Sequence, residues 1–260
     1  MQKTLSERHK QWELSELLVK YPGLRLHPSK GLDVIVQGIL EFSATQKGGE
    51  QIDDEYSLRI QIPDRYPRLL PSIWEVNKRI PPKFHKLDDG SLCLGSETRL
   101  RLMLLRSPSI LSFVDMCVVP YLYGHSFFEE HGRMPFGELS HGKKGVIEDL
   151  AELFGVDERI VLGFVAVAAM KKNVANKRSC PCGSGLRLGS CHRKRVNTLR
   201  KQLGRRWFAY LMDQLVDKPV YGSNVRTSDM NAYFQRSSLD DNRFEFLPLT
   251  AEHLLGGTKR

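Results

Sequence analysis

The chain has 260 residues, of which 41% are hydrophobic and 9% aromatic, and this composition excludes wholesale disorder and allows a sizeable buried core. No apolar run is long enough to cross a bilayer and the N-terminus lacks the apolar stretch of a secretory signal, so we expect a cytoplasmic protein whose five cysteines stay reduced. The net charge of +9 resides in residues 171–206, which hold twelve lysines and arginines and no acidic residue.

The first part of the chain is predicted to form a helix followed by antiparallel strands. Apolar residues from Trp12 to Leu18 recur at helical spacing, and this helix is expected to end before Pro22. Strands are predicted at residues 33–42, 56–62 and 72–76. In the second strand apolar and polar residues alternate, a pattern typical of a half-buried antiparallel strand.

Residues 78–108 contain no long periodic element, and we predict a largely irregular stretch there. Helices are then predicted at residues 109–119, 145–154, 157–172 and 195–216. The first is expected to end before Pro120, and Asp157 is expected to cap the third. A helix, antiparallel strands, an irregular stretch and further helices in this order indicate an α+β fold with a sheet of about four strands.

Four potential metal ligands lie within thirteen residues of one another: Cys180, Cys182, Cys191 and His192. Thiolates and an imidazole suit tetrahedral zinc, and four protein ligands fill its shell, so we expect one structural zinc ion. Gly183 and Gly185 allow the turn that joins the ligands. The alternative is a redox pair, or cysteines without a metal. The sequence Cys-Pro-Cys-Gly-Ser-Gly followed by Cys-His resembles the SEC-C motif, which implies zinc binding in an accessory interaction module.

Cys93 stands apart from this cluster, in a polar loop and between two leucines. An isolated cysteine is most often a small core residue, and we expect this of Cys117, which lies in an apolar run. A cysteine in a loop held by a rigid scaffold is also a candidate nucleophile, because a thiol accepts an acyl group and releases it again. The residues around Cys93 leave both interpretations open.

The order of the segments around the lone cysteine resembles the ubiquitin-conjugating enzyme family. Tyr66, Pro67 and Pro71 match the Tyr-Pro-x-x-x-Pro segment of that family. His85 matches the histidine of its His-Pro-Asn segment, and residues 90–94 match its active-site turn, Gly-x-Ile-Cys-Leu. The later stretch that leads to the SEC-C motif looks like the divergent bacterial members of this fold.

The resemblance spans about residues 5–195 and implies a division of the chain into functional parts. These parts are a conjugating domain at 1–155, a connecting helix at 156–175, the zinc motif with a basic helix at 176–215, and a tail at 216–260. Cys93 is implied as the nucleophile that accepts a protein C-terminal glycyl group as a thioester, and His85 as an orienting residue. Possible neighbours at the active site are Asp89, Glu97 and His141.

One departure from the family pattern concerns the oxyanion formed during attack on the thioester. Lys86 and Leu87 stand where the family has Pro and Asn, and this Asn is the side-chain donor to the oxyanion. The loss of one such donor costs about 3–4 kcal/mol of transition-state stabilisation. A backbone amide or Ser96 is a possible replacement, and a partner protein is another.

The family resemblance further implies a role in bacterial antiphage defence. The implied partners are a cGAS-like nucleotidyltransferase or a ubiquitin-like modifier, and an activating enzyme, because no phosphate-binding glycine loop is present to adenylate a C-terminus. Two alternatives remain: a non-catalytic binding module, and a nucleic-acid-binding protein that uses the basic segment 171–206. The Leu-Leu-Gly-Gly sequence at 254–257 is interpreted as a coincidental likeness to the end of a modifier.

Overall fold

The computed structural model describes residues 12–29, 31–46, 48–135 and 142–216. The chain divides into two compact units, Met1–Ser223 and Asn224–Arg260, and all described residues belong to the first. Two features singled out in the sequence, His141 and the Leu-Leu-Gly-Gly at 254–257, lie outside the described residues.

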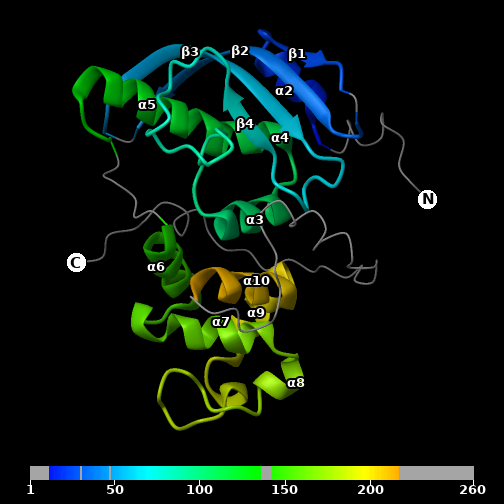
Figure 1. Cartoon of the computed structure of the whole chain (residues 1–260), viewed down its shortest axis with the longest axis vertical. Helices are drawn as coiled ribbons and strands as arrows, with labels where there is room; N and C mark the ends of the chain where they lie inside the picture. Colours follow the sequence, from blue (N-terminus) through cyan, green and yellow to red (C-terminus); the bar gives the residue numbers. More distant parts are fainter. Residues whose placement is uncertain (1–11, 30, 47, 136–141, 217–260) are drawn as a thin grey trace. The chain divides into compact units, whose positions relative to one another are not determined.

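A four-stranded antiparallel sheet organises the N-terminal part of the described chain, and the α+β class is confirmed (Figure 1). The strands pair in chain order: β1 Leu24–His27, β2 Val34–Thr45, β3 Gln51–Ile62 and β4 Ser72–Glu75. Strand β1 was not predicted, because only one of its four residues is buried. The alternation predicted in β3 is confirmed, since Tyr56, Leu58 and Ile60 are buried while Arg59 is exposed.

Helices cover one face of this sheet and complete its core. Helix α2 spans Leu14–Lys20 and ends before Pro22 as predicted, with Leu14 and Leu17 buried. A longer helical segment follows the sheet in sequence, and α5 at its end packs on β2 and β3 (Figure 1). This segment consists of α4 Ile110–Phe113, the π-helical turn η1 Val114–Val118 and α5 Val119–His131.

The prediction that a helix ends before Pro120 is wrong, because the helical segment continues to His131. Proline lacks an amide hydrogen, and the π-helical turn directly before α5 changes the hydrogen-bond spacing where that donor is missing. We expected no segment long enough to cross a bilayer. This expectation is corrected by the helical segment Ile110–His131, which is long and apolar enough to do so. Its most apolar window is 67% buried, as in the core helix of a soluble protein.

The prediction of an irregular stretch at 78–108 is wrong for its last part, where helix α3 spans Glu97–Arg106. Its sequence mixes arginines with leucines, so no apolar stripe marks it. Arg101 nevertheless faces inward: its guanidinium lies 4.5 Å from the ring centre of Trp207 and donates to the carbonyl of Arg68 at 2.8 Å. Because a charged residue occupies a buried position of this helix, the spacing of its apolar residues does not reveal the helix in the sequence.

The C-terminal part of the described chain is helical. Its longer helices are α6 Gly142–Phe154, α7 Val161–Ala169, α9 Arg193–Leu203 and α10 Arg205–Leu215, and its short elements are η2 Glu158–Ile160, α8 Lys172–Ala175 and η3 Leu188–Ser190. Phe154, Phe164 and Phe208 form its aromatic core. The predicted cap at Asp157 is confirmed by the hydrogen bond from the Arg159 amide, 2.9 Å. The predicted helix at 195–216 is two helices, because Gly204 adopts a left-handed φ of 83° between them.

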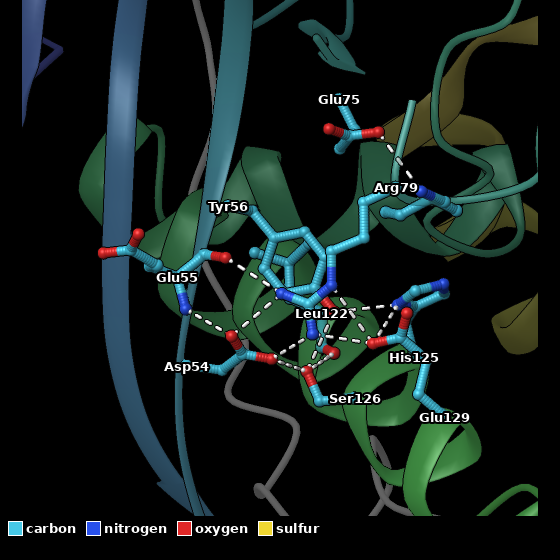
Figure 2. Close-up of polar contacts among 10 residues, drawn as sticks. Asp54, Glu55, Tyr56, Glu75, Arg79, Leu122, His125, Ser126 and Glu129 are labelled. Carbon is cyan, nitrogen blue, oxygen red and sulfur yellow. Dashed lines mark hydrogen bonds and ion pairs between the residues drawn. The ribbon is translucent and has the colours of Figure 1, made fainter. Parts of the chain in front are cut away.

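A network of charged and polar side chains joins β3, the loop after β4 and α5 (Figure 2). The Arg79 guanidinium donates to both carboxylate oxygens of Asp54, at 2.9 and 2.7 Å, and to Glu129 at 2.6 Å. It also lies over the ring of Tyr56, 4.3 Å from the ring centre. A single cation therefore connects two side chains of β3, Asp54 and Tyr56, to Glu129 of α5.

The hydroxyl of Tyr56 extends this network into the core. It lies 2.8 Å from Nδ1 of His125 and 2.9 Å from Oγ of Ser126, and the Ser126 hydroxyl donates to Asp54 at 2.6 Å. His125 is only 1% exposed, and its burial lowers the pKa of the imidazole. Burial thus favours the neutral form of His125, whose Nδ1 shares a hydrogen bond with the Tyr56 hydroxyl.

The ionisation of Asp54 is predicted to stabilise the fold. Burial opposes ionisation, but hydrogen bonds from Arg79, Ser126 and the Glu55 amide lower the pKa of Asp54 to about 2. A lowered folded-state pKa contributes stability above the unfolded-state pKa that is lost as pH falls from about 4 to 2. We expect Asp54→Asn to remove about 1–2 kcal/mol of this acid-dependent stability, measured by urea unfolding across that range. Asp64→Asn, the same change outside the network, should leave the pH dependence intact.

Candidate active site and metal centre

Cys93 follows a tight turn that is closed by main-chain hydrogen bonds. The Gly90 amide donates to the carbonyl of Leu87 and the Leu87 amide donates to the carbonyl of Ser91, both at 2.8 Å. Asp89 accepts from the amide and the hydroxyl of Ser91, at 2.9 and 2.6 Å. The carboxylate of Asp89, named above as a possible neighbour at the active site, therefore accepts hydrogen bonds within the turn itself.

The turn is attached to the sheet and to the segment before it. The Leu92 amide donates to the carbonyl of Ile73 in β4, and the Cys93 amide donates to the carbonyl of His85, each at 2.8 Å. Leu92 is buried, while Cys93 is half-buried. Cys117, in contrast, is buried in the core as predicted. Cys93 therefore presents part of its surface to solvent from a backbone that is fixed on both sides.

His85 positions Cys93 through its main chain. Its φ of 40° lies in the left-handed region, which directs its carbonyl to the Cys93 amide. The hydroxyl of Tyr121 lies 3.0 Å from the Phe84 carbonyl and 3.2 Å from the His85 carbonyl. Burial, and secondly the neighbouring Cys93, raise the pKa of Tyr121. Sequence reasoning missed Tyr121, because it lies in an apolar helix 36 residues from His85.

The ring of Phe84 connects this segment to the polar network of Figure 2. It meets the imidazole of His125 edge to face, with ring centres 4.7 Å apart, and it also contacts Tyr121 and Phe128. The strained His85 backbone is thus backed by aromatic packing on α5. This packing holds the carbonyl that binds the Cys93 amide.

At the two positions where ubiquitin-conjugating enzymes have Pro and Asn, this chain has a lysine that binds a main-chain carbonyl and a leucine without a polar side-chain group. Lys86 donates its ammonium to the Ile80 carbonyl at 2.7 Å, and the Leu87 side chain is 53% exposed. Ser96, a possible replacement, donates its hydroxyl to Asp149 at 2.6 Å. Glu97, predicted near the active site, forms an ion pair with Arg101 at 2.7 Å. His141 lies outside the described residues.

The four predicted metal ligands lie together, with their ligand atoms all within 4.8 Å of one another. Nδ1 of His192 is 3.3 Å from Cys180 Sγ and 3.2 Å from Cys191 Sγ, and Cys182 Sγ is 3.6 Å from Cys191 Sγ. Ligands on a tetrahedral ion at ordinary bond lengths are separated by about 3.6–3.8 Å. The donor set and its spacing therefore fit a tetrahedral metal ion.

A small hairpin shapes this metal centre. Ser179 and Arg187 form an antiparallel bridge, and Gly183 and Gly185 have φ values of 76° and 74°, as the turn requires. Hydrogen bonds from Ser184 lower the pKa of Cys182 to about 6, which favours the thiolate that a metal binds. Four protein ligands leave no open position, which is the arrangement of a structural metal.

The hairpin packs closely on α7. The imidazole of His192 meets the ring of Phe164 edge to face, with ring centres 5.1 Å apart. A Cβ added at Gly163 would lie 2.8 Å from Cβ of Pro181, the residue between Cys180 and Cys182. The absence of a side chain at residue 163 therefore sets the distance between α7 and the metal ligands.

The sequence matches no protein-family model and no curated protein. The likeness to the ubiquitin-conjugating enzymes and to the SEC-C motif therefore depends on the motif residues, to which the structure adds an α+β fold and the grouping of Cys180, Cys182, Cys191 and His192.

The Tyr121 hydroxyl is predicted to hold the segment that positions Cys93. Tyr121→Phe removes a partner from the Phe84 carbonyl, and we expect a loss of about 1–2 kcal/mol in the free energy of unfolding. Amide hydrogen exchange at residues 84–94 should become faster. Tyr123→Phe is the matched control, because that hydroxyl binds the Glu50 carbonyl instead. Equal exchange at 84–94 in both variants would contradict the assignment.

Close packing at Gly163 is predicted to control metal affinity. Gly163→Ala pushes Pro181 away from α7 and displaces the two cysteines beside it, so we expect weaker binding of Co²⁺ as a spectroscopic probe. The measurement is a titration of the absorption band of tetrahedral thiolate-bound Co²⁺. Gly124→Ala serves as control, because its Cβ would meet only Met134 Cε at 3.7 Å. An unchanged affinity in Gly163→Ala would refute the role of this contact.

Proposed function

We propose that the chain is a cysteine-dependent conjugating enzyme of the ubiquitin-conjugating type. The observation that supports this proposal most directly is the setting of Cys93. Cys93 is half-buried directly after a turn that main-chain hydrogen bonds fix, while the leucine before it is buried in the core. A nucleophile that meets another protein's C-terminus needs this combination of access and rigid placement.

The proposed reaction begins with a C-terminal glycyl group that a partner has activated as an acyl adenylate or a thioester. The Cys93 thiol loses its proton to solvent and its sulfur attacks the carbonyl carbon, a new thioester bond forms, and AMP or the partner's thiolate leaves. In the second step an amine nitrogen attacks the same carbon, an amide bond forms, Cys93 departs as a thiolate, and the amine loses a proton to solvent. Without an acceptor amine, the thioester persists as a held complex.

A non-catalytic binding module is the second candidate function, and one observation favours it. Lys86 and Leu87 do not replace the side-chain donor that the family has in its Asn, since the Lys86 ammonium binds the Ile80 carbonyl and leucine has no polar side-chain group. Loss of such a donor costs about 3–4 kcal/mol. If the chain is a conjugating enzyme, we therefore propose that the acyl group is transferred to the amine in a complex whose partner protein supplies the hydrogen-bond donor to the oxyanion.

The remaining assignments follow from the same resemblance and are part of the proposal. Zinc is the metal that the three thiolates and one imidazole would hold, and it would stabilise a hairpin that has little core of its own. The SEC-C-like motif would then be an accessory module beside the conjugating part. The partners proposed are a cGAS-like nucleotidyltransferase or a ubiquitin-like modifier, in cytoplasmic antiphage defence.

The test is the variant Cys93→Ser, produced as the full chain together with the proteins encoded beside its gene. A serine oxyester is more stable than a thioester, so we expect an adduct whose intact mass equals the chain plus the acyl partner less one water. Peptide mapping should place the adduct on residue 93. The control, Cys93→Ala, should carry none.

Two outcomes would overturn the proposal. One is an unmodified Cys93→Ser chain in cells where the partner proteins are active. The other is equal function of Cys93→Ala and the wild type in the same cells, which would favour the binding module.

A further inference from the structure

Part of the basic excess at 171–206 has a structural role. The Arg195 guanidinium donates to the carbonyls of Glu152 and Leu153 at the end of α6, and Arg205 donates to the carbonyl of Ala169 at the end of α7. The last carbonyls of a helix lack intrahelical donors, so Arg195 at Leu153 and Arg205 at Ala169 act as C-caps, while the Glu152 carbonyl also accepts from the Gly155 amide. The remaining cations of the segment need a different explanation.

A groove of about 690 Å³ collects several of these cations beside α8 and α9. It is lined by Lys172, Asn176, Arg193, Lys194, Asn197, Thr198, Arg200 and Lys201. On α9 the lining residues recur three and four positions apart, so they form one face of the helix. Among the described residues no carboxylate forms an ion pair with Lys172, Lys194 or Lys201, which are all exposed.

Arg200 adds a buried positive charge to this groove. It is 8% exposed, and its guanidinium donates to the carbonyls of Val167 and Ala168 and to the side chain of Asn197. A helix end carries only about half a negative charge, and Arg205 binds the same end of α7. The groove therefore keeps a net positive potential that its neutral oxygen partners do not cancel.

The lining identifies the class of ligand. No aromatic or aliphatic residue is present to anchor a protein partner, whereas protein interfaces depend on such anchors. Lysines, arginines, asparagines and a threonine are the side chains that contact phosphodiester oxygens. We propose that this groove binds the phosphate backbone of a nucleic acid, without reading its bases.

The proposal makes a quantitative claim about salt. Each phosphate that a cation neutralises contributes about −0.7 to −0.9 to the slope of log affinity against log salt. Contacts from three exposed lysines give a slope of about −2 or steeper. The affinity should then fall at least about 16-fold between about 50 and 200 mM salt.

The experiment measures fluorescence anisotropy of labelled single-stranded RNA and DNA of about 20 nucleotides with the full, zinc-loaded chain. In the groove variant Lys172→Gln, Lys194→Gln and Lys201→Gln are combined, and we expect a salt slope shallower by about 2 and an affinity at least tenfold weaker. The matched control combines Lys177→Gln, Arg178→Gln and Arg187→Gln, three exposed cations of the same segment outside the groove. It should lose less than about threefold.

Three results would overturn the proposal: no binding by the wild-type chain, equal losses in the groove variant and the control, or tighter binding of polyglutamate than of either nucleic acid. The melting temperature and zinc content of each variant exclude misfolding as the cause of a loss. Cys93→Ala should bind nucleic acid like the wild type, so this test stands or fails separately from the conjugating activity.

Discussion

Two main-chain hydrogen bonds, from the Leu92 amide to Ile73 and from the Cys93 amide to His85, determine how this protein presents its thiol. Leu92 is buried in the core, while Cys93, directly after it, is half-buried. The placement of the sulfur is therefore a consequence of core packing, and it needs no dedicated side-chain ligand. A conjugating reaction at Cys93 would use a nucleophile that the hydrophobic core itself positions.

The polar network around Arg79 and His125 explains how the strained backbone at His85 is tolerated. Arg79 connects β3 to α5 through paired carboxylates, and the Tyr56 hydroxyl holds His125 in place. The imidazole of His125 supports the ring of Phe84, which precedes the left-handed residue His85. Buried polar groups are costly unless they are satisfied, and a satisfied set has few alternative arrangements. The rigidity of the proposed active site thus originates in the polar network around Arg79, Tyr56 and His125, which contacts the active-site segment through Phe84.

The C-terminal helices use positive charge in two ways. Where a guanidinium reaches the end of a helix, as Arg195 does at the Leu153 carbonyl of α6, it replaces a hydrogen bond that the helix lacks. Where lysines line the groove beside α8 and α9, their charge is available to a ligand. The hairpin that carries the four potential metal ligands lies in sequence between α8 and α9, the two helices beside this groove.

The sequence by itself determined the features that depend on neighbouring residues: the alternation in β3, the cap at Asp157, and the metal ligands, which share one short loop. The tertiary structure alone decided which distant residues meet. It buried Arg101 against Trp207, so the apolar spacing of the sequence did not reveal α3. It also continued the helical segment past Pro120 through a π-helical turn. It also placed the Tyr121 hydroxyl on the His85 carbonyl and gathered the lysines into one groove. Local patterns record backbone period and turn chemistry, whereas contacts between residues far apart in sequence arise only when the elements pack.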